Sequence, residues 1–341
     1  MEQSKPQQTL AEIAAMFDGQ VQCSRLSDTA QIPLVIQPTT GPTDLIAWGQ
    51  RHAAAFQALL PVHGALLLRG FAVGGPEVFE QFTDVVSQQL LQYNERSSPR
   101  TQVGTNIYTS TEYPASETIF LHNENSYQST WPLKIFFYCA VAAKSGGETP
   151  IADCRRIYDK IRPEVRVAFA EKQVMYVRNF GDGFGLAWQN VFQTDDKSKV
   201  DAYCRSAGIT PEWKDGDKLR TRQVRPAIAR HPHTGALTWF NHATFFHITT
   251  LDPIIQRVLR KNFPEQDLPS NSYYGDGTPI EPEVMEHLRE VYQSEQVSFT
   301  WQEGDVLALD NMLVAHGRSP FVGPRRVLVA MSEPWSDYGL A

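Results

Sequence analysis

The sequence predicts one β-core with helices packed on its outside. Segments with strand character gather toward both ends of the chain, and the middle mixes helices with short strands, so regular βαβ alternation is missing. No glycine-rich nucleotide loop follows a predicted strand, which leaves a Rossmann fold without support. The 341 residues are 42% hydrophobic and 20% charged, a globular composition that can bury a substantial core. We therefore expect a mainly β fold with flanking helices.

The first elements combine helices with a buried strand. Apolar residues recur at helical spacing over 43–60 and again over 75–90. Between them, GALLLRGF (64–71) is almost entirely apolar, as in a short buried strand. Three strands separated by polar loops are then predicted at 106–114, 117–124 and 133–143.

The middle of the chain, 155–295, is predicted to be an insertion of helices and loops in a single domain that spans 1–341. Helical patterns occur at 155–172, 197–208, 253–263 and 282–292. Strand patterns occur at 221–231 and 236–246. The chain then returns to strands, which are predicted at 296–301, 304–311 and 325–333.

Charge and cysteine usage exclude several classes of function. The net charge of −7 argues against nucleic acid as a partner, because phosphate binding needs a basic surface. No apolar run is long enough to span a membrane, and the first residues do not have the pattern of a signal peptide. The four cysteines form no CxxC pair and are expected to be reduced. These features predict a cytoplasmic protein.

His122 and Glu124, in LHNENSY (121–127), are the first candidate metal ligands. In a strand, residues two apart project to the same face, so both side chains would reach one point. A hydrogen-bonded surface pair explains the same motif, and for an isolated HxE pair it is the commoner explanation.

His316 and Arg326 add to this pair. His316 lies in a loop between two apolar strands, and the second of these carries Arg326, Leu328 and Ala330 on one face. A buried arginine suits a carboxylate ligand, although a salt bridge to a core Asp or Glu is the alternative. Two histidines and one carboxylate form the facial triad of non-haem Fe(II) oxygenases.

Six segments together resemble one known family, the clavaminate-synthase-like, TauD/TfdA-type Fe(II)/2-oxoglutarate dioxygenases. Within it, the sequence is most similar to the branch of the syringomycin-biosynthesis-type amino-acid hydroxylases. The segments follow the family's order and, from residue 108 to residue 331, span roughly two-thirds of the chain. They are YTSTEYP (108–114), LHNENSY (121–127), WPLKIFFYC (131–139), GGETPIADCRRIY (146–158), TGALTWFNHATFFH (234–247) and GDVLALDNMLVAHGRSPFVGPRRVLVAM (304–331).

The resemblance implies a double-stranded β-helix, or jelly roll, that uses Fe(II), 2-oxoglutarate and O2. It implies that His122, Glu124 and His316 bind iron, that Thr149 helps to hold 2-oxoglutarate, and that Arg326 binds its distal carboxylate. Arg325 points to the opposite face in a regular strand, so Arg326 is the expected residue. The sequence departs from the taurine-dioxygenase pattern in two ways: the triad carboxylate is Glu rather than Asp, and Ala330 stands where some members carry an arginine.

Four further residues are candidate substrate contacts: Ser110, Tyr127, Asn241 and Arg318. Core, turn or solvent roles explain each of them equally well. The histidines of HPH (231–233), together with His242 and His247, are expected to be structural rather than a second metal site. The glycine- and aromatic-rich RNFGDGFGLAWQN (178–190) is a candidate lid, and a plain surface loop is the alternative.

The resemblance implies hydroxylation of an unactivated carbon of an amino acid, free or tethered to a carrier protein, in specialised-metabolite biosynthesis, with release of succinate and CO2. Halogenases of this type replace the triad carboxylate with a small residue, so Glu124 favours hydroxylation. Desaturation or cyclisation with the same cofactors stays open. The alternative of another class is a non-catalytic jelly roll that binds a metal or small ligand.

Overall fold

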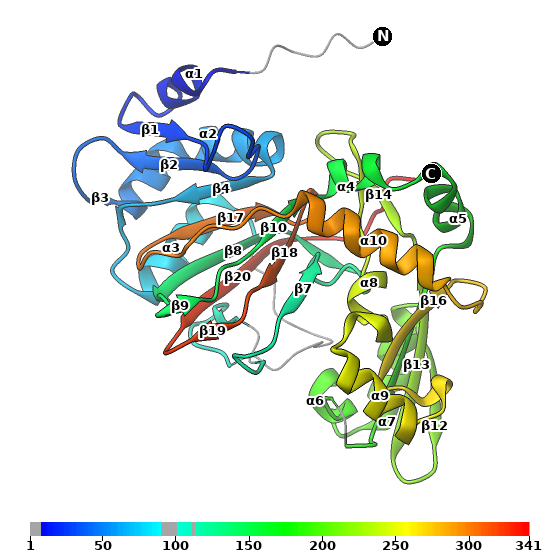
Figure 1. Cartoon of the computed structure of the whole chain (residues 1–341). Helices are drawn as coiled ribbons and strands as arrows, with labels where there is room; N and C mark the ends of the chain where they lie inside the picture. Colours follow the sequence, from blue (N-terminus) through cyan, green and yellow to red (C-terminus); the bar gives the residue numbers. More distant parts are fainter. Residues whose placement is uncertain (1–7, 90–100, 111–112, 184, 341) are drawn as a thin grey trace.

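The computed structural model describes residues 8–89, 101–110, 113–183 and 185–340, and a seven-stranded sheet forms its centre (Figure 1). β2 and β4 are parallel, and the other neighbours are antiparallel. The sheet thus joins strands from the two ends of the chain. In spatial order they are β1 (Val21–Ser24), β2 (Leu34–Pro38), β4 (Ala65–Leu68), β17 (Val306–Asp310), β8 (Trp131–Val141), β20 (Arg326–Trp335) and β6 (Tyr108–Thr109).

A three-stranded antiparallel sheet forms the second layer of the core. Its order is β10 (Ile151–Asp153), β18 (Val314–Arg318), β7 (Ile119–His122). One apolar cluster joins the two sheets, with Phe137 and Val329 from the large sheet and Val314 from the small one, all buried. This two-layer arrangement is the double-stranded β-helix expected from the sequence.

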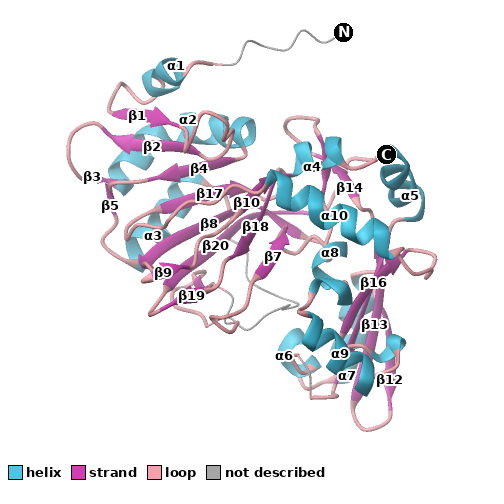
Figure 2. Ribbon diagram, in the orientation of Figure 1, coloured by secondary structure: helices cyan, strands magenta, loops and turns pink. Residues whose placement is uncertain are grey.

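Helices cover the other face of the seven-stranded sheet (Figure 2). They are α2 (Leu45–His63) and α3 (Pro76–Val86), and α1 (Leu10–Ala15) lies at the edge of the sheet beside β1. Phe56 of α2 and Phe82 of α3 belong to the apolar cluster that also contains Phe136 and Leu328 of the sheet. A Cβ at Gly49 of α2 would lie 2.9 Å from the Phe82 ring, so glycine permits the close approach of the two helices. Helices are thus confirmed in the segments 43–60 and 75–90, although the second ends at Val86 and residue 90 lies outside the described residues.

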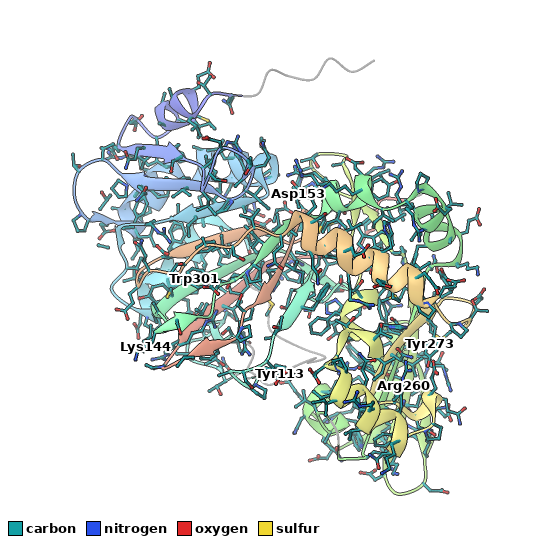
Figure 3. All side chains as sticks on the ribbon, in the orientation of Figure 1. Tyr113, Lys144, Asp153, Arg260, Tyr273 and Trp301 are labelled. Atoms are coloured by element: carbon teal, nitrogen blue, oxygen red, sulfur yellow. The ribbon has the colours of Figure 1, made fainter. Side chains whose placement is uncertain are left out.

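The segment between β10 and β17 builds a second region, which lies beside the jelly roll (Figure 1). Four of its strands form an antiparallel sheet in the order β12-β13-β11-β16. In Figure 3, Tyr273 and Arg260 mark this region and Trp301 marks the core. Its elements are α4 (Cys154–Lys160), α5 (Pro163–Lys172), β11 (Val174–Phe180), α6 (Trp188–Phe192), α7 (Lys197–Ser206), β12 (Thr210–Lys214), β13 (Lys218–Arg225), β14 (Ile228–Arg230), β15 (Leu237–Trp239), α8 (Ala243–Phe246), η1 (Ile248–Thr250), α9 (Pro253–Asn262), η2 (Glu265–Asp267), β16 (Ser270–Tyr274) and α10 (Pro282–Glu295).

Several predicted elements have different bounds in the structure. The helix expected over 155–172 is two helices, because Pro163 starts α5 after an extended residue at Ile161. The strand expected over 236–246 ends at Trp239, and α8 follows. The segment 296–301 forms a single bridge, between Val297 and Ile151, instead of a strand. Short pairings complete the fold: β3 (Thr43–Asp44) with β5 (Phe71–Ala72), and β9 (Ser145–Gly146) with β19 (Phe321–Val322).

All four cysteines are free, and three of them are buried. Across the described residues, no helix combines the length and the apolar character needed to cross a membrane.

Candidate active site

His122, Glu124 and His316 lie together between the two layers of the jelly roll. β18 pairs with β7 so that His316 stands opposite His122. Each of the three residues offers one ligand atom, and these atoms all lie within 4.8 Å of one another. His316 Nε2 is 3.8 Å from Glu124 Oε2. A Cβ at Gly317 would lie 2.6 Å from the carbonyl oxygen of Ile119, so glycine beside His316 allows β18 to approach β7.

Hydrogen bonding orients the His122 ring. Its Nδ1 lies 2.8 Å from the carbonyl oxygen of Phe120, which fits a donating Nδ1–H and leaves the Nε2 lone pair for a ligand. The Phe245 ring packs against the imidazole with centroids 4.6 Å apart. The ring is therefore held on two sides before any ligand binds.

Glu124 lies in a turn and not, as predicted, in the same strand as His122. β7 ends at His122, and Glu124 lies in the turn that follows, next to Asn125 with a positive φ of 57°. Strand alternation therefore does not explain why the two side chains converge. The turn directs the carboxylate back toward the histidines.

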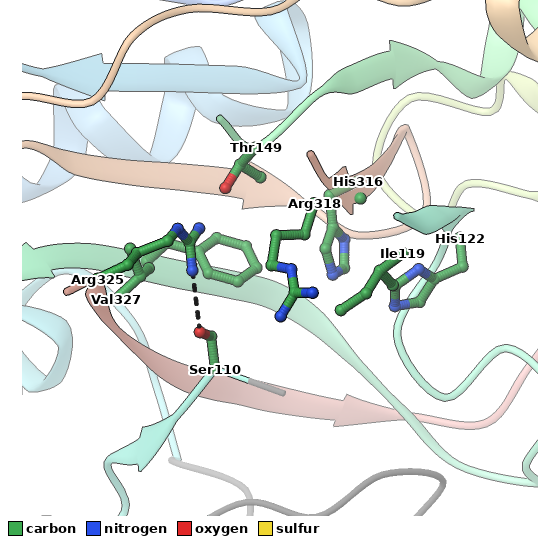
Figure 4. A pocket seen from close by; sticks show the side chains of 10 residues that line it. Ser110, Ile119, His122, Thr149, His316, Arg318, Arg325 and Val327 are labelled. Atoms are coloured by element: carbon green, nitrogen blue, oxygen red, sulfur yellow. Dashed lines mark hydrogen bonds between the residues drawn. The ribbon is translucent and has the colours of Figure 1, made fainter. Parts of the chain in front are cut away.

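A cavity opens beside His122 and His316 (Figure 4). Apolar and polar side chains share its wall, and besides the two histidines three predicted site residues, Ser110, Thr149 and Arg318, are among them. The ten lining residues are Ser110, Ile119, His122, Phe137, Thr149, His316, Gly317, Arg318, Arg325 and Val327.

Arg325, and not Arg326, is the arginine of PRRV that lines the cavity. Arg326 is exposed and lies on the face of β20 that continues into Leu328 and the helix-covered cluster. Arg325 precedes β20 and shares its direction with Val327, which also lines the cavity. The expectation of Arg326 is corrected here. Strand alternation separated the two arginines correctly, but both faces of β20 are buried, so the apolar pattern alone could not tell which face borders the site.

The Arg325 guanidinium is held by neutral groups. Its Nε donates to the carbonyl oxygen of Gly147 at 2.8 Å, and its Nη1 lies 3.4 Å from Ser110 Oγ. A Cβ at Gly147 would lie 2.9 Å from Arg325 Cδ, so this glycine leaves room for the side chain. Burial, followed by the nearby charge of Arg318, lowers the pKa of Arg325 to about 10. An anion in the cavity would offset this cost of burial.

Thr149 and Arg318 differ in what they offer the cavity. The Thr149 hydroxyl accepts a hydrogen bond from Trp301 Nε1 at 3.1 Å, and Figure 4 shows its oxygen on the cavity side. Arg318 donates from Nη1 to the carbonyl of Tyr113 at 2.9 Å and from Nη2 to the carbonyl of Glu117 at 2.8 Å. Burial lowers the Arg318 pKa. Arg318 therefore fastens the loop that leads into β7.

Tyr127 and Asn241 lie outside the cavity lining. Tyr127 is fully buried, with its ring centroid 5.0 Å from that of His242. Asn241 Nδ2 donates to the carbonyl of Ala227 at 2.8 Å, and its Oδ1 accepts from the Ala243 N–H at the start of α8 at 2.9 Å. The Asn241 side chain therefore stabilises the main chain of this segment through both of its polar atoms.

Two of the remaining histidines occupy well-defined polar environments. His231 Nε2 lies 2.9 Å from Asp310 Oδ2, and its Nδ1 accepts from the Thr234 N–H at 3.1 Å, which confirms the structural turn predicted for HPH. His242 Nδ1 lies 2.7 Å from Ser126 Oγ, and its ring is 5.4 Å from that of His122. Burial holds the pKa of His242 well below its usual range. Sequence reasoning did not place His242 beside the cluster, because α8 was predicted as a strand.

The jelly roll brings together His122, Glu124 and His316, whose two imidazoles and one carboxylate could hold a metal ion and are the donor set of non-haem iron oxygenases. The family described as "Taurine catabolism dioxygenase TauD, TfdA family" matches residues 34–331. The chain belongs to this family of Fe(II)/2-oxoglutarate-dependent dioxygenases, and its cofactors are Fe(II) and 2-oxoglutarate.

Two relatives and one solved structure are similar to the chain. The dapdiamide synthesis protein DdaC of Enterobacter agglomerans is 43% identical over 276 residues, which cover 81% of this chain and 84% of DdaC. A clavaminate synthase-like protein of Arabidopsis thaliana is 31% identical over 284 residues, 80% of this chain and 83% of the relative. PvcB of Pseudomonas aeruginosa shares the fold with a TM-score of 0.54 at 16% identity, over 91% of this chain and 90% of PvcB.

Proposed function

We propose that the protein hydroxylates an unactivated carbon of an amino acid, or of an amino-acid-derived substrate, in specialised-metabolite biosynthesis. The cluster of His122, Glu124 and His316 beside a cavity lined by the partly buried Arg325 carries this proposal. The relative DdaC is named for dapdiamide synthesis, which supports a biosynthetic role. Release of succinate and CO2 would accompany each turnover.

The donor set fits Fe(II). Two imidazole nitrogens and one carboxylate oxygen within 4.8 Å are the ligand types of a facial site with open positions. His122, Glu124 and His316 would hold the metal, and the bound iron with 2-oxoglutarate supplies the oxidising chemistry. Because Glu124 supplies a carboxylate where halogenases of this type have a small residue, transfer of oxygen is favoured over transfer of halide.

Arg325 and Thr149 are proposed to bind the distal carboxylate of 2-oxoglutarate. They belong to one cavity wall, and among the described residues Arg325 has no carboxylate as an ion-pair partner. A guanidinium fork matches a carboxylate in charge and shape. Ser110 Oγ, at 3.4 Å from Nη1, would orient the fork. Arg318 is not included in this proposal, because its guanidinium donates to the carbonyls of Tyr113 and Glu117.

The segment 155–295 is proposed to close over the substrate, as expected of a lid. Phe245 of this segment touches the His122 ring, and the guanidinium of Arg178 lies 5.7 Å from the Tyr127 ring centroid. Limited proteolysis in the presence of Mn(II) and 2-oxoglutarate tests this role. Slower cleavage between residues 181 and 187 supports closure, and unchanged cleavage there contradicts it.

Anaerobic spectroscopy and product analysis test the proposed reaction. Fe(II) and 2-oxoglutarate added without oxygen should give the weak visible charge-transfer band of the chelate. Free and carrier-tethered amino acids are then screened for substrate-stimulated succinate and for products heavier by one oxygen atom. A product lighter by two hydrogens would indicate desaturation instead. Absence of both band and succinate across the panel would support a non-catalytic binding protein.

A further inference from the structure

Asn311 connects the turn that carries Glu124 to the hairpin that carries His316. It follows β17 and precedes β18 by a few residues, and its side chain is 0% exposed. Its Oδ1 accepts from the Glu124 N–H at 2.8 Å, and its Nδ2 donates to the Glu124 carbonyl at 2.9 Å. Both backbone groups of one candidate ligand are therefore bonded to one amide.

Three further hydrogen bonds join Asn311 to the residues on either side of Glu124. Asn311 Nδ2 also donates to the carbonyl of Pro132 at 2.9 Å. The main chain of Asn311 accepts from Asn123 Nδ2 at 2.6 Å and donates to the carbonyl of Leu133 at 2.8 Å. Asn311 is thus bonded to the residues before and after the turn, as well as to the turn itself.

The position of Glu124 explains why such a connection is needed. β7 ends at His122, so the β18 ladder that aligns His122 with His316 does not extend to Glu124. The next residue, Asn125, has a left-handed backbone with φ of 57°, so the chain leaves the extended conformation directly after Glu124. The Asn311 amide supplies to Glu124 the pair of backbone bonds that a neighbouring strand would otherwise provide.

We propose that Asn311 is a positioning residue for the metal site: it sets the Glu124 carboxylate against His316 and thereby raises the affinity for iron. The inference rests on the proposed iron site and adds a residue that does not itself bind the metal. Groups that orient metal ligands in this way commonly contribute about 10–100-fold to metal affinity.

Measurement of metal affinity, in the absence of any catalytic reaction, tests this role. Asn311→Ala removes both bonds to Glu124. Asn311→Asp keeps the acceptor and the shape but turns an oxygen toward the carbonyls of Glu124 and Pro132. Mn(II) is titrated into each metal-free protein, and free Mn(II) is followed by electron paramagnetic resonance. We expect both variants to bind Mn(II) about 10–100-fold more weakly than the parent protein.

Asn179 provides the matched control. It is a buried asparagine whose Nδ2 donates to the carbonyls of Gln266 and Leu268, and it lies in the four-stranded sheet on β11. Asn179→Ala should lower the thermal stability and, in titrations without 2-oxoglutarate or substrate to close the proposed lid, leave Mn(II) affinity unchanged. This control separates positioning of a ligand from general loss of stability.

The outcomes are distinguishable. Unchanged Mn(II) affinity in the folded Asn311 variants overturns the positioning role while the iron site stands. Failure of the parent protein to bind Mn(II) overturns the proposed function itself. Thermal unfolding of the metal-free proteins shows which variants fold. If the alanine variant does not fold, the more conservative Asn311→Asp decides the question by the same titration.

Discussion

The two neighbouring arginines of PRRV, Arg325 and Arg326, have opposite environments. Arg325 lines the cavity and is held by Gly147 and Ser110, whereas Arg326 is exposed on the other side of the chain. The pair is a natural matched control, because the two residues have the same chemistry and adjacent positions.

Arg325→Ala should raise the KM for 2-oxoglutarate steeply. Loss of one partner from a buried charged pair costs about 2–5 kcal/mol, which corresponds to about 30-fold or more in affinity. Arg326→Ala should leave that KM unchanged. Steady-state succinate formation at varied 2-oxoglutarate measures both, and a reversed pattern would restore Arg326 as the carboxylate contact.

Glu124→Ala should abolish hydroxylation while the protein stays folded. The carboxylate is one of only three proposed metal ligands, and its replacement leaves two histidines to hold the metal. Product analysis and circular dichroism of the same preparation check the two halves of this expectation. Activity retained in a folded Glu124→Ala variant would remove Glu124 from the ligand set.

At the scale of elements, one face of β20 packs against helices and the other face borders the cavity. Leu328 packs into the cluster shared with α2 and α3, whereas Val327 borders the cavity. Leu328→Ala should therefore lower the free energy of unfolding by about 2–5 kcal/mol. Its KM for 2-oxoglutarate should match that of the parent protein. Urea unfolding and kinetics measure the two quantities, and a large KM change would show that the faces are coupled.

Local periodicity in the sequence was sufficient to predict the helices, and the family resemblance predicted the jelly roll and the three candidate ligands. The helices at 43–60 and 75–90, the jelly roll and the assembly of His122, Glu124 and His316 agree with the structure. Two predictions were wrong, the strand position of Glu124 and the choice of Arg326, and both depended on contacts that local periodicity does not contain. The turn at Glu124 depends on Asn311, a residue distant in sequence, and the choice between Arg325 and Arg326 depends on which buried face of β20 borders a cavity.

At the scale of the whole molecule, buried neutral histidines predict sensitivity to acid. Burial is the largest cause that lowers the pKa of His63 and of His247 from 6.5 to about 4. The unfolded chain takes up these protons near pH 6.5, whereas the folded protein does so only near pH 4. The free energy of unfolding should therefore fall as the pH decreases through this window.

His63→Gln should reduce that fall, since glutamine does not titrate. Urea unfolding at neutral pH and at about pH 5 gives the change for each protein. His233→Gln is the control, because His233 lies on the surface of the HPH turn. An equal fall in the parent protein and in His63→Gln would show that other groups cause the acid sensitivity.

The pairing of His122 with His316 also has a consequence for how the enzyme is made. The two residues are partners across one ladder, yet they come from distant parts of the chain. During synthesis, the first histidine and Glu124 emerge from the ribosome long before the strand that completes the site. The nascent chain thus has an incomplete set of proposed ligands until β18 is released, so we expect iron to be loaded only after most of the polypeptide has been translated.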